Sequence, residues 1–549
     1  MPWSQVYDPL HNWMLSALVA ALPVVVLLGS LAFLRLKAHY AATLGLAASL
    51  AVTMAVFRMP AEKAALVAVY GAAYGLLPIG WIIFNVIFLY TLVTRTGLFE
   101  VLQDSLTSVT RDRRLQLLLI AYCFGGFFEG AAGFGTPVAV TAAILIGMGF
   151  QPLKASGLSL IANTAPVAFG ALGTPLIALQ GVTGLGLLAL SAQTGRLLAF
   201  FCLIIPFWLI WAFAGFRKML EVWPALLVAG AAFAVPQLLI SNLHGPWLAA
   251  VGGALVSLGA LILLLLVWRP RNVFRFPGDA TEAEEVATAE ARGHDRRRVM
   301  LAWLPWLILS LLVFLWGIPQ VRALLDAISI IRIHVPDVDQ LINRVPPVVP
   351  KPTPEAAVYT LNWLSATGTS IFLAAVVTAI ALRIRAREFA AAWWATLKRV
   401  KYSLLTVSAM LGLGFVTRYG GLDAGMGLAF ARTGFLYPFF GTLLGWLGVA
   451  LTGSDTSSNV LFGSLQKISA QQLGLSPVLM ASANSCGGVM GKMIDAQSIV
   501  VASTATQWYG HEGNILRYVF LHSLTLAALV GLLVLLAAYV FPFTGLVVG

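Results

Sequence analysis

Charge is scarce in this sequence, and cysteine is scarcer still. Of its 549 residues only 10% are Asp, Glu, Lys or Arg, whereas 59% are hydrophobic and the mean hydropathy is +0.89. Soluble globular proteins carry about 25% charged residues, so this composition excludes an ordinary soluble globule. The three cysteines, Cys123, Cys202 and Cys486, are odd in number, scattered and without metal-ligand spacing. Such a set gives no disulfide framework, so we expect free thiols.

The apolar residues fall into long runs that are separated by short basic loops. A helix that crosses a bilayer needs about 20 apolar residues, and the runs leave room for roughly a dozen spans and some shorter, broken ones. The sequence therefore predicts an all-α polytopic membrane protein of transporter size, with roughly 12 or more transmembrane helices. No cleavable signal peptide is expected, because the first apolar segment, from about Trp13 to Leu34, lacks a basic leader and is followed by Arg35 and Lys37.

The net charge of +12 comes from basic residues in the short loops, where they set topology, so it does not indicate nucleic acid as a partner. The positive-inside rule places the loop from Arg35 to His39 in the cytoplasm and the N-terminus outside. The most polar segment, 269–298, is predicted to be a solvated cytoplasmic linker between a first membrane half, 1–268, and a second, 299–549. A proline-rich loop, 318–363, is expected outside, with extended polyproline-like backbone.

Two glycine-rich stretches place an acid inside apolar surroundings. FFEGAAGFGTPVAV, from Phe127 to Val140, contains Glu129, and GSDTSSN, from Gly453 to Asn459, contains Asp455. In lipid, irregular backbone is tolerated only where protein or a water-filled cavity satisfies its polar groups. We therefore expect two pseudo-repeated halves, each with a broken or re-entrant segment, that meet at one internal site. No basic residue occurs between Arg114 and Lys154, so Glu129 is expected to lack a local cation.

Two further passages combine small and polar residues. NTAPVAFGALGTPLIAL, from Asn163 to Leu179, repeats the phrase GTP and predicts a broken helix beside the first stretch, although such residues also serve close helix packing. The passage from Ser482 to Thr504 contains Lys492 and Asp495. Charges at membrane depth usually face a cavity or a partner and are functional. The alternative is a structural ion pair, because residues three apart on a helix are neighbours.

Motifs of soluble enzymes are absent. GGVMGKM, from Gly487 to Met493, has three rather than four residues between its outer glycines and no Ser or Thr after the lysine, so it is not a phosphate loop. The pair His511 and Glu512 is not followed by a second histidine, because Ile515 takes that place. We expect no cofactor and no metal site.

Four blocks of the sequence resemble the bacterial L-lactate permease family, which includes glycolate permeases. They are FFEGAAGFGTPVAV, LTGSDTSSNVLFGSLQ, ANSCGGVMGKMIDAQSIVVA and, at Leu364–Ser370, LSATGTS. The resemblance in organisation covers essentially the whole chain. It implies a multi-pass protein of the bacterial cytoplasmic (inner) membrane that carries L-lactate and related 2-hydroxymonocarboxylates, such as glycolate and D-lactate, together with a proton. Family members vary around Cys486 and Asp495.

The residues and the resemblance together give a hypothesis for the site. The carboxylate of a 2-hydroxy acid needs helix N-termini or a cation, and its hydroxyl needs a polar side chain. Proton coupling needs a carboxyl that desolvation disposes to bind a proton near neutral pH. The candidates for proton coupling are Glu129, Asp455 and Asp495. The candidates for substrate binding are Gly135, Thr136, Asn163, Thr174, Ser454, Thr456, Ser457, Ser458, Asn484, Lys492 and Gln497.

The predicted partners are thus a small monocarboxylate anion, H⁺ and the lipid bilayer, with no prediction of oligomeric state. A sodium-coupled carboxylate carrier is an alternative, since Asp455 and neighbouring hydroxyls could also coordinate a hard cation. A membrane-embedded hydrolase with Ser454 or Ser457 as nucleophile is disfavoured, because neither stretch contains a histidine. A channel is disfavoured by the lack of repeated rings of pore-lining charge.

Overall fold

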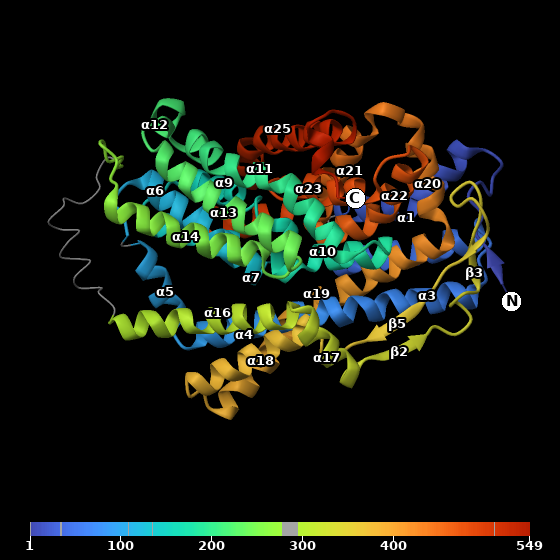
Figure 1. Ribbon diagram of the computed structural model, residues 1–549, viewed down its shortest axis with the longest axis horizontal. Helices are drawn as coiled ribbons and strands as arrows, with labels where there is room; N and C mark the ends of the chain where they lie inside the picture. The colour runs from blue at the N-terminus through green and yellow to red at the C-terminus, as the bar shows by residue number, and fades with distance from the viewer. Residues whose placement is uncertain are drawn as a thin grey trace.

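The computed structural model describes residues 2–32, 34, 36–107, 109–133, 136–276, 295–509 and 511–548. In this part of the chain, long helices run mainly along the longest axis of the molecule, as Figure 1 shows. The structural elements before the linker are α1 (Trp13–Ala32), α2 (Ala38–Ala55), α3 (Ala61–Tyr74), η1 (Gly75–Gly80), α4 (Trp81–Arg95), α5 (Leu98–Thr107), α6 (Arg113–Leu117), η2 (Leu118–Phe124), α7 (Gly125–Ala131), α8 (Thr136–Gly147), α9 (Pro152–Ala162), η3 (Val167–Phe169), α10 (Gly170–Thr183), α11 (Leu187–Ala214), α12 (Phe216–Leu220), α13 (Trp223–Leu243) and α14 (Ala249–Val267).

Further helices follow the linker. They are α16 (Arg296–Gly317), α17 (Pro319–Ser329), α18 (Thr367–Ala381), α19 (Ala386–Gly420), α20 (Leu422–Phe430), η4 (Ala431–Leu436), α21 (Tyr437–Thr452), α22 (Asp455–Gln472), α23 (Pro477–Gly491), α24 (Ala496–Ala505), α25 (Glu512–Tyr539) and η5 (Phe543–Leu546). Most of the linker, 277–294, lies outside the described residues.

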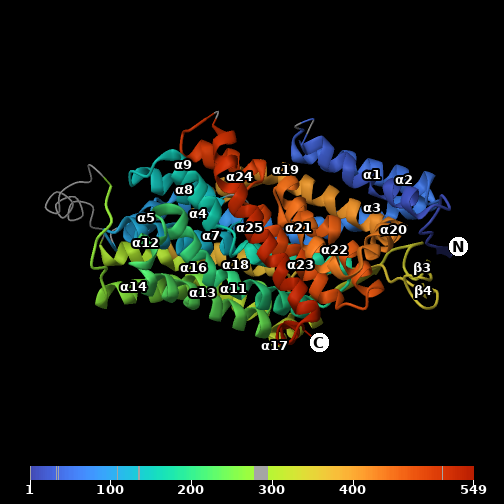
Figure 2. The same cartoon turned by 90° about the horizontal axis from the view of Figure 1, so that it is seen from above.

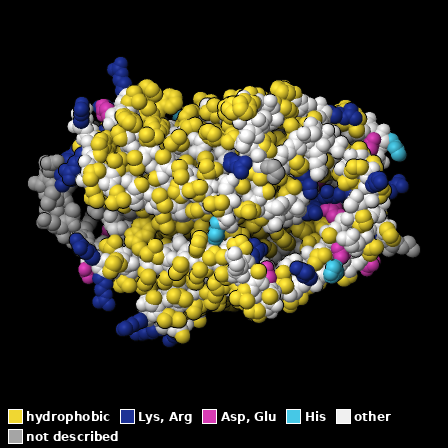
Figure 3. Space-filling view, in the orientation of Figure 1, with side chains coloured by type: hydrophobic (Ala, Val, Ile, Leu, Met, Phe, Trp, Pro, Cys, Tyr) yellow, Lys and Arg dark blue, Asp and Glu magenta, His cyan; other side chains and the backbone are white. Residues whose placement is uncertain are grey.

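Among the described residues, nine helices are long and apolar enough to cross a membrane, or up to ten if one bent pair counts as a span. That pair joins α9 to η3 and α10 with a bend of 65°. The expected total of roughly a dozen is not reached by full-length helices, because the segments near Glu129 and Asp455 are short and interrupted. Hydrophobic side chains cover the middle of the face seen in Figure 3, and Lys and Arg gather mostly at its two ends. The predicted all-α polytopic membrane fold is confirmed.

Breaks occur where the sequence carries proline and glycine. The apolar run that includes Pro78 is one span with a break, since Leu77 has φ −137° and ψ 121° between α3 and α4. Proline cannot donate a helical hydrogen bond and disfavours helical backbone in the residue before it. The charged segment between Arg95 and Arg114 contains α5.

A small cap of strands covers one end of the molecule, at the right of Figure 1. The strands are β1 (Trp3–Ser4), β2 (Ile331–His334), β3 (Ile342–Arg344), β4 (Thr353–Pro354) and β5 (Val358–Leu361). β3 pairs with β1 in parallel and with β4 antiparallel, while β2 pairs antiparallel with β5. The expected polyproline-like loop is therefore partly β-structure. The pairing of β1 with β3 places the N-terminal segment and this loop on the same side of the protein.

The two halves interlock rather than lie side by side. α10 packs against α22, α8 against α24, and α9 against α25, so each contact joins an element from before the linker to one from after it. Figure 2 shows α25 running between α9 and α21. Glycines allow the closest approaches within this core. A Cβ on Gly445 of α21 would overlap the backbone carbonyl of Asn484 in α23, so only glycine fits there without displacing a helix.

We expect Gly445→Ala to push α21 and α23 apart and to lower the free energy of unfolding by about 1–3 kcal/mol. The measurement is thermal stability of the purified protein in detergent, read as the fraction that stays monodisperse after heating. Gly259→Ala in α14 is the matched control, because a Cβ there meets no atom within 4 Å and alanine favours the helix. Equal stability of the two variants would contradict the close-packing account.

Candidate functional site

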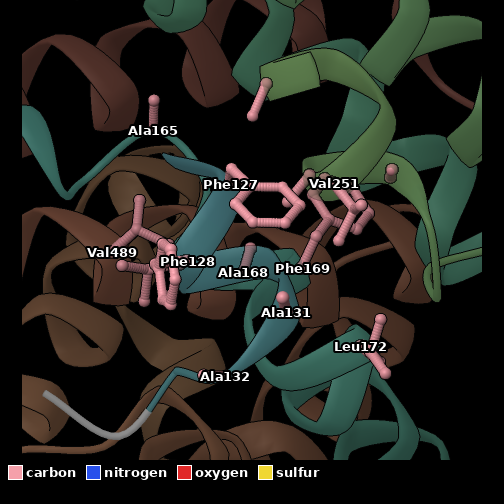
Figure 4. Packing of buried hydrophobic residues seen from close by; sticks show 14 of the residues in the cluster. Phe127, Phe128, Ala131, Ala132, Ala165, Ala168, Phe169, Leu172, Val251 and Val489 are labelled. Atoms are coloured by element: carbon pink, nitrogen blue, oxygen red, sulfur yellow. The ribbon is translucent and has the colours of Figure 1, made fainter. Parts of the chain in front are cut away.

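Glu129 lies on the short helix α7 and is only 4% exposed. Its surroundings are apolar: Figure 4 shows Phe127 and Phe128 of the same helix in a cluster with Phe169, Val251 and Val489 from three other elements. The amide of Asn163 donates a hydrogen bond of 3.0 Å to Oε2 of the carboxyl group. The other oxygen, Oε1, approaches Gly170 so closely that a Cβ there would lie 2.6 Å from it.

The chain between α9 and α10 is unwound beside Glu129. Asn163 ends α9, and Ala171, Leu172 and Gly173 have left-handed backbone with φ of 43°, 55° and 81°. Left-handed conformations of residues other than glycine cost energy and collect at functional sites. The carbonyl of Pro175, which follows the unwound residues, accepts a hydrogen bond of 3.2 Å from Asn459 in α22. The broken helix expected here is present, and its backbone is bonded to an element from after the linker.

Asp455 is the first residue of α22 and is 3% exposed. Ser454 caps this helix by accepting from the amide of Ser457 at 3.3 Å, because a serine side chain satisfies an otherwise unpaired N–H there. The Oδ2 atom of Asp455 accepts from the Ser485 hydroxyl at 2.5 Å. Within the described residues its Oδ1 atom has no hydrogen-bond partner.

A chain of buried amides continues from Asp455 along one face of α22. The Nδ2 group of Asn484 donates to Oδ1 of Asn459 at 3.0 Å and lies 3.4 Å from the Ser458 hydroxyl, and Gln466 donates to Oδ1 of Asn484 at 3.2 Å. Asn459 also contacts Oδ2 of Asp455 at 3.5 Å. Buried polar groups are costly unless they are paired. This network therefore fixes how α22 and α23 present their side chains to the site.

Lys492 and Asp495 lie in the turn between α23 and α24 rather than within one helix. The ammonium nitrogen of Lys492 donates to the carbonyl of Gly453 at 2.7 Å and lies 3.3 Å from Oδ2 of Asp495. The Oδ1 atom of Asp495 accepts from the amide of Ser498 at 2.7 Å, which caps α24. The ion pair considered from the sequence is therefore formed. Because Lys492 also binds Gly453, it ties this turn to the break before Asp455.

The charge of Lys492 reaches both glycine-rich breaks, because it interacts electrostatically with Glu129 and with Asp455. Glu129 has no cation near it in the sequence, but in the fold it interacts with one. Its cation comes from more than 360 residues further along the chain, which the local sequence could not indicate. Glu129 and Asp455 also act on each other electrostatically, so the two acids belong to one region.

The remaining candidate residues differ in burial and in hydrogen bonding. Gly135 and the side chain of Thr136 lie outside what is described. The Thr174 hydroxyl turns back to the carbonyl of Gly170, at 3.5 Å, while Gln497 is exposed. Thr456 is buried, and Ser458 donates to the carbonyl of Gly445 at 3.0 Å.

Sequence reasoning missed two side chains of the site, Asn459 and Ser485. Both lie in stretches that the sequence singles out, GSDTSSN and SANSC, but nothing in the pattern tells which polar residue faces the acid. The three cysteines are buried free thiols. No group of three or more His, Cys, Asp or Glu placed to hold a metal ion is found in the described part of the chain.

Known proteins align with this chain almost from end to end. The family model described as L-lactate permease matches residues 16–541. L-lactate permeases of Escherichia coli (strain K12) and Bacillus subtilis (strain 168) are each 44% identical, over 98% of this chain and over 98% and 99% of their own lengths. The glycolate permease GlcA of Escherichia coli (strain K12) is 44% identical over 100% of this chain and 99% of its own. A match of this extent shows that the chain belongs to the L-lactate permease family of membrane transport proteins.

Proposed function

We propose that this protein is a secondary active transporter that carries L-lactate, glycolate and D-lactate across the bacterial cytoplasmic membrane together with a proton. The observation that carries the proposal is a single buried cation, Lys492, among the acids Glu129, Asp455 and Asp495, which are drawn from both halves of the chain. The substrate class follows from the names of the relatives, which are lactate and glycolate permeases.

The carboxylate of the substrate binds at Lys492 in this proposal. An ammonium group has three donors, and Lys492 uses one of them on the Gly453 carbonyl. The N-terminal end of α24 follows it in the chain, and that of α22 lies just after Gly453, whose carbonyl Lys492 binds; both ends favour negative charge. For the hydroxyl group of the substrate, the structure offers Oδ1 of Asn163, a buried atom with no hydrogen-bond partner among the described residues.

In this proposal, the charge balance of the site couples proton binding to anion binding. Lys492 is one positive charge against three acids, so adding an anion to the site while all three are ionised is electrostatically unfavourable. A proton on Glu129 or Asp455 removes one negative charge and so favours anion binding, and by linkage the bound anion favours the proton. One proton per monocarboxylate makes the transport cycle electroneutral.

Sodium coupling is the second candidate, because the unpaired Oδ1 atom of Asp455 is the kind of hard oxygen ligand that Na⁺ prefers. Uptake of labelled lactate into vesicles distinguishes the two. A proton gradient alone, without sodium, drives accumulation in the proposed mechanism, whereas a sodium gradient at constant pH drives it in the alternative.

Lys492→Met keeps much of the apolar stem and removes the charge. We expect the apparent affinity for lactate to fall roughly 10- to 100-fold, since a charge-assisted hydrogen bond contributes about 1.5–3 kcal/mol. The measurement is the concentration dependence of labelled lactate uptake. Lys154→Met is the control, because Lys154 contacts Tyr518 and the carbonyl of Ala212 instead of the acids of the site.

The variant also leaves Asp495 without its ion-pair partner. The double variant Lys492→Met, Asp495→Asn removes both charges and tests whether any defect is one of folding. If Lys492→Met is well folded and transports with unchanged affinity, Lys492 is a structural partner of Asp495 and does not bind substrate.

Glu129→Gln mimics the protonated carboxyl group and can still accept the hydrogen bond from Asn163. We expect the variant to bind lactate and to exchange internal for external lactate, but to lose accumulation driven by a proton gradient. Counterflow and gradient-driven uptake in the same vesicles measure the two activities. Accumulation that persists would move the coupling proton elsewhere, with Asp455 the next candidate and Asp455→Asn its test. Loss of binding as well would instead make Glu129 a substrate contact or a support of the fold.

A further inference from the structure

A second group of charges lies away from Lys492, where the strand cap meets the helices. Arg344 at the end of β3, Arg418 in the last turn of α19 and Lys467 of α22 converge around Glu355, which lies between β4 and β5. Arg344 reaches the two carboxylate oxygens of Glu355 at 2.9 and 3.2 Å. Arg418 reaches Oε1 of the same carboxylate with two of its nitrogens, both at 2.8 Å.

The group holds more positive charge and more donors than its own acceptors use. A guanidinium group has five N–H donors and an ammonium group three. Beyond Glu355, the hydrogen bonds formed are those of Arg418 to the carbonyl of Gly181, at 2.8 Å, and of Lys467 to that of Thr183, at 2.6 Å.

Two other acids lie near the group. Asp339 is paired with His334 at 2.6 Å and with the amide of Ala357, whereas Asp423 is buried in α20 and interacts electrostatically with Arg418 and Arg344. Two cations, Arg344 and Arg418, contact the carboxylate of Glu355, and Lys467 interacts with it electrostatically.

The cations of the cluster are partly accessible to solvent. The side chains of Arg344 and Arg418 are 15% and 13% exposed, and Lys467 is partly exposed. Basic groups that solvent reaches attract small anions from solution.

Glu355 itself takes the position that an anionic ligand would have between the two arginines. Burial alone raises the pKa of a carboxyl group, but Arg418 and Arg344 together lower the pKa of Glu355 below its ordinary value. It is therefore ionised at neutral pH, with its carboxylate held in the fork of two guanidinium groups. That geometry is the one arginine uses for carboxylate ligands in general.

The cluster is connected to the central site through α10. Arg418 and Lys467 bind carbonyls in the last turn of this helix, where its dipole favours cations. The other end of α10 carries the left-handed residues beside Glu129. At 1.5 Å per residue, the regular part of this helix, 174–183, spans about 15 Å.

We propose that Arg344, Arg418 and Lys467 form an outer binding site for a small monocarboxylate, and that Glu355 fills the place of this anion in the conformation described here. The site receives the anion before it moves along α10 to Lys492, and thus rests on the proposed function. The positive-inside rule puts this end of the protein outside the cell.

A cysteine at position 184 reports on the outer site without requiring transport. A Cβ on Gly184 would lie 3.4 Å from a guanidinium nitrogen of Arg418, and the three native cysteines are buried. We expect an anionic methanethiosulfonate reagent to label Gly184→Cys faster than a neutral one, and lactate to slow the labelling. Adding Glu355→Gln removes the competing anion and should lower the half-protecting lactate concentration about threefold or more. Adding Arg344→Gln should raise it by about the same factor.

Asp339→Asn is the matched control, because it breaks the other ion pair of the cap and leaves the three cations in place. Protection should be unchanged in this variant. Reaction with the neutral reagent at an unchanged rate shows that the cap stays folded in each variant. Absence of lactate protection, or an equal effect of Asp339→Asn, would overturn the outer site.

Transport provides a second, independent measurement. In oriented vesicles Glu355→Gln should lower the lactate KM from the side of the cap about threefold and leave the KM from the opposite side unchanged. An equal change from both sides would overturn the outer site even if the cysteine variant does not fold. Protection by lactate in a protein that does not transport it would leave the outer site standing and overturn the proposed function.

Discussion

The buried ammonium group of Lys492 is the interaction on which the centre of this protein depends. An ion at such depth costs several kcal/mol unless oxygen atoms surround it. Here the oxygens come from the carbonyl of Gly453 and the carboxylate of Asp495, and Glu129 and Asp455 act on it through space. The oxygens that contact Lys492 thus come from the break before Asp455 and from its own turn, while the acid of the other break, Glu129, interacts with it electrostatically.

The breaks in the helices are stabilised by contacts with other elements. Each interruption of a helix frees N–H and carbonyl groups that lipid cannot satisfy, and in this structure a side chain or backbone group of another element meets several of them. Asn459 binds the carbonyl of Pro175, just after the unwound part of α10, and Lys492 binds that of Gly453, between α21 and α22. Two glycines leave room for the acids. A side chain at Gly170 would press on the carboxyl group of Glu129, and one at Gly488 on that of Asp455.

Composition and the local pattern were sufficient to predict the membrane fold, the two breaks and the acids within them. Long apolar runs indicate segments that lie in the membrane, and glycine together with proline indicates irregular backbone. The partners were not predictable in the same way. Nothing around Glu129 indicates that its cation is Lys492, and nothing around Asp455 singles out Ser485, because those contacts are set by how two halves pack. The proline-rich loop shows the same limit, since the pairing of β3 with Trp3 and Ser4 depends on a segment some 340 residues earlier.

α10 joins the two charged regions because each uses a different end of it. Its C-terminal carbonyls attract Arg418 and Lys467, and its unwound N-terminal part lies against Glu129. A helix held by cations at one end and strained at the other is placed to respond to a change of charge at either. If an anion replaced Glu355 in the arginine fork, the cap would lose one contact to α19 but keep others, such as the bond from Tyr419 to the carbonyl of Ala356, and α10 would keep both cations. A change of occupant in the fork can therefore leave both the cap and α10 in place.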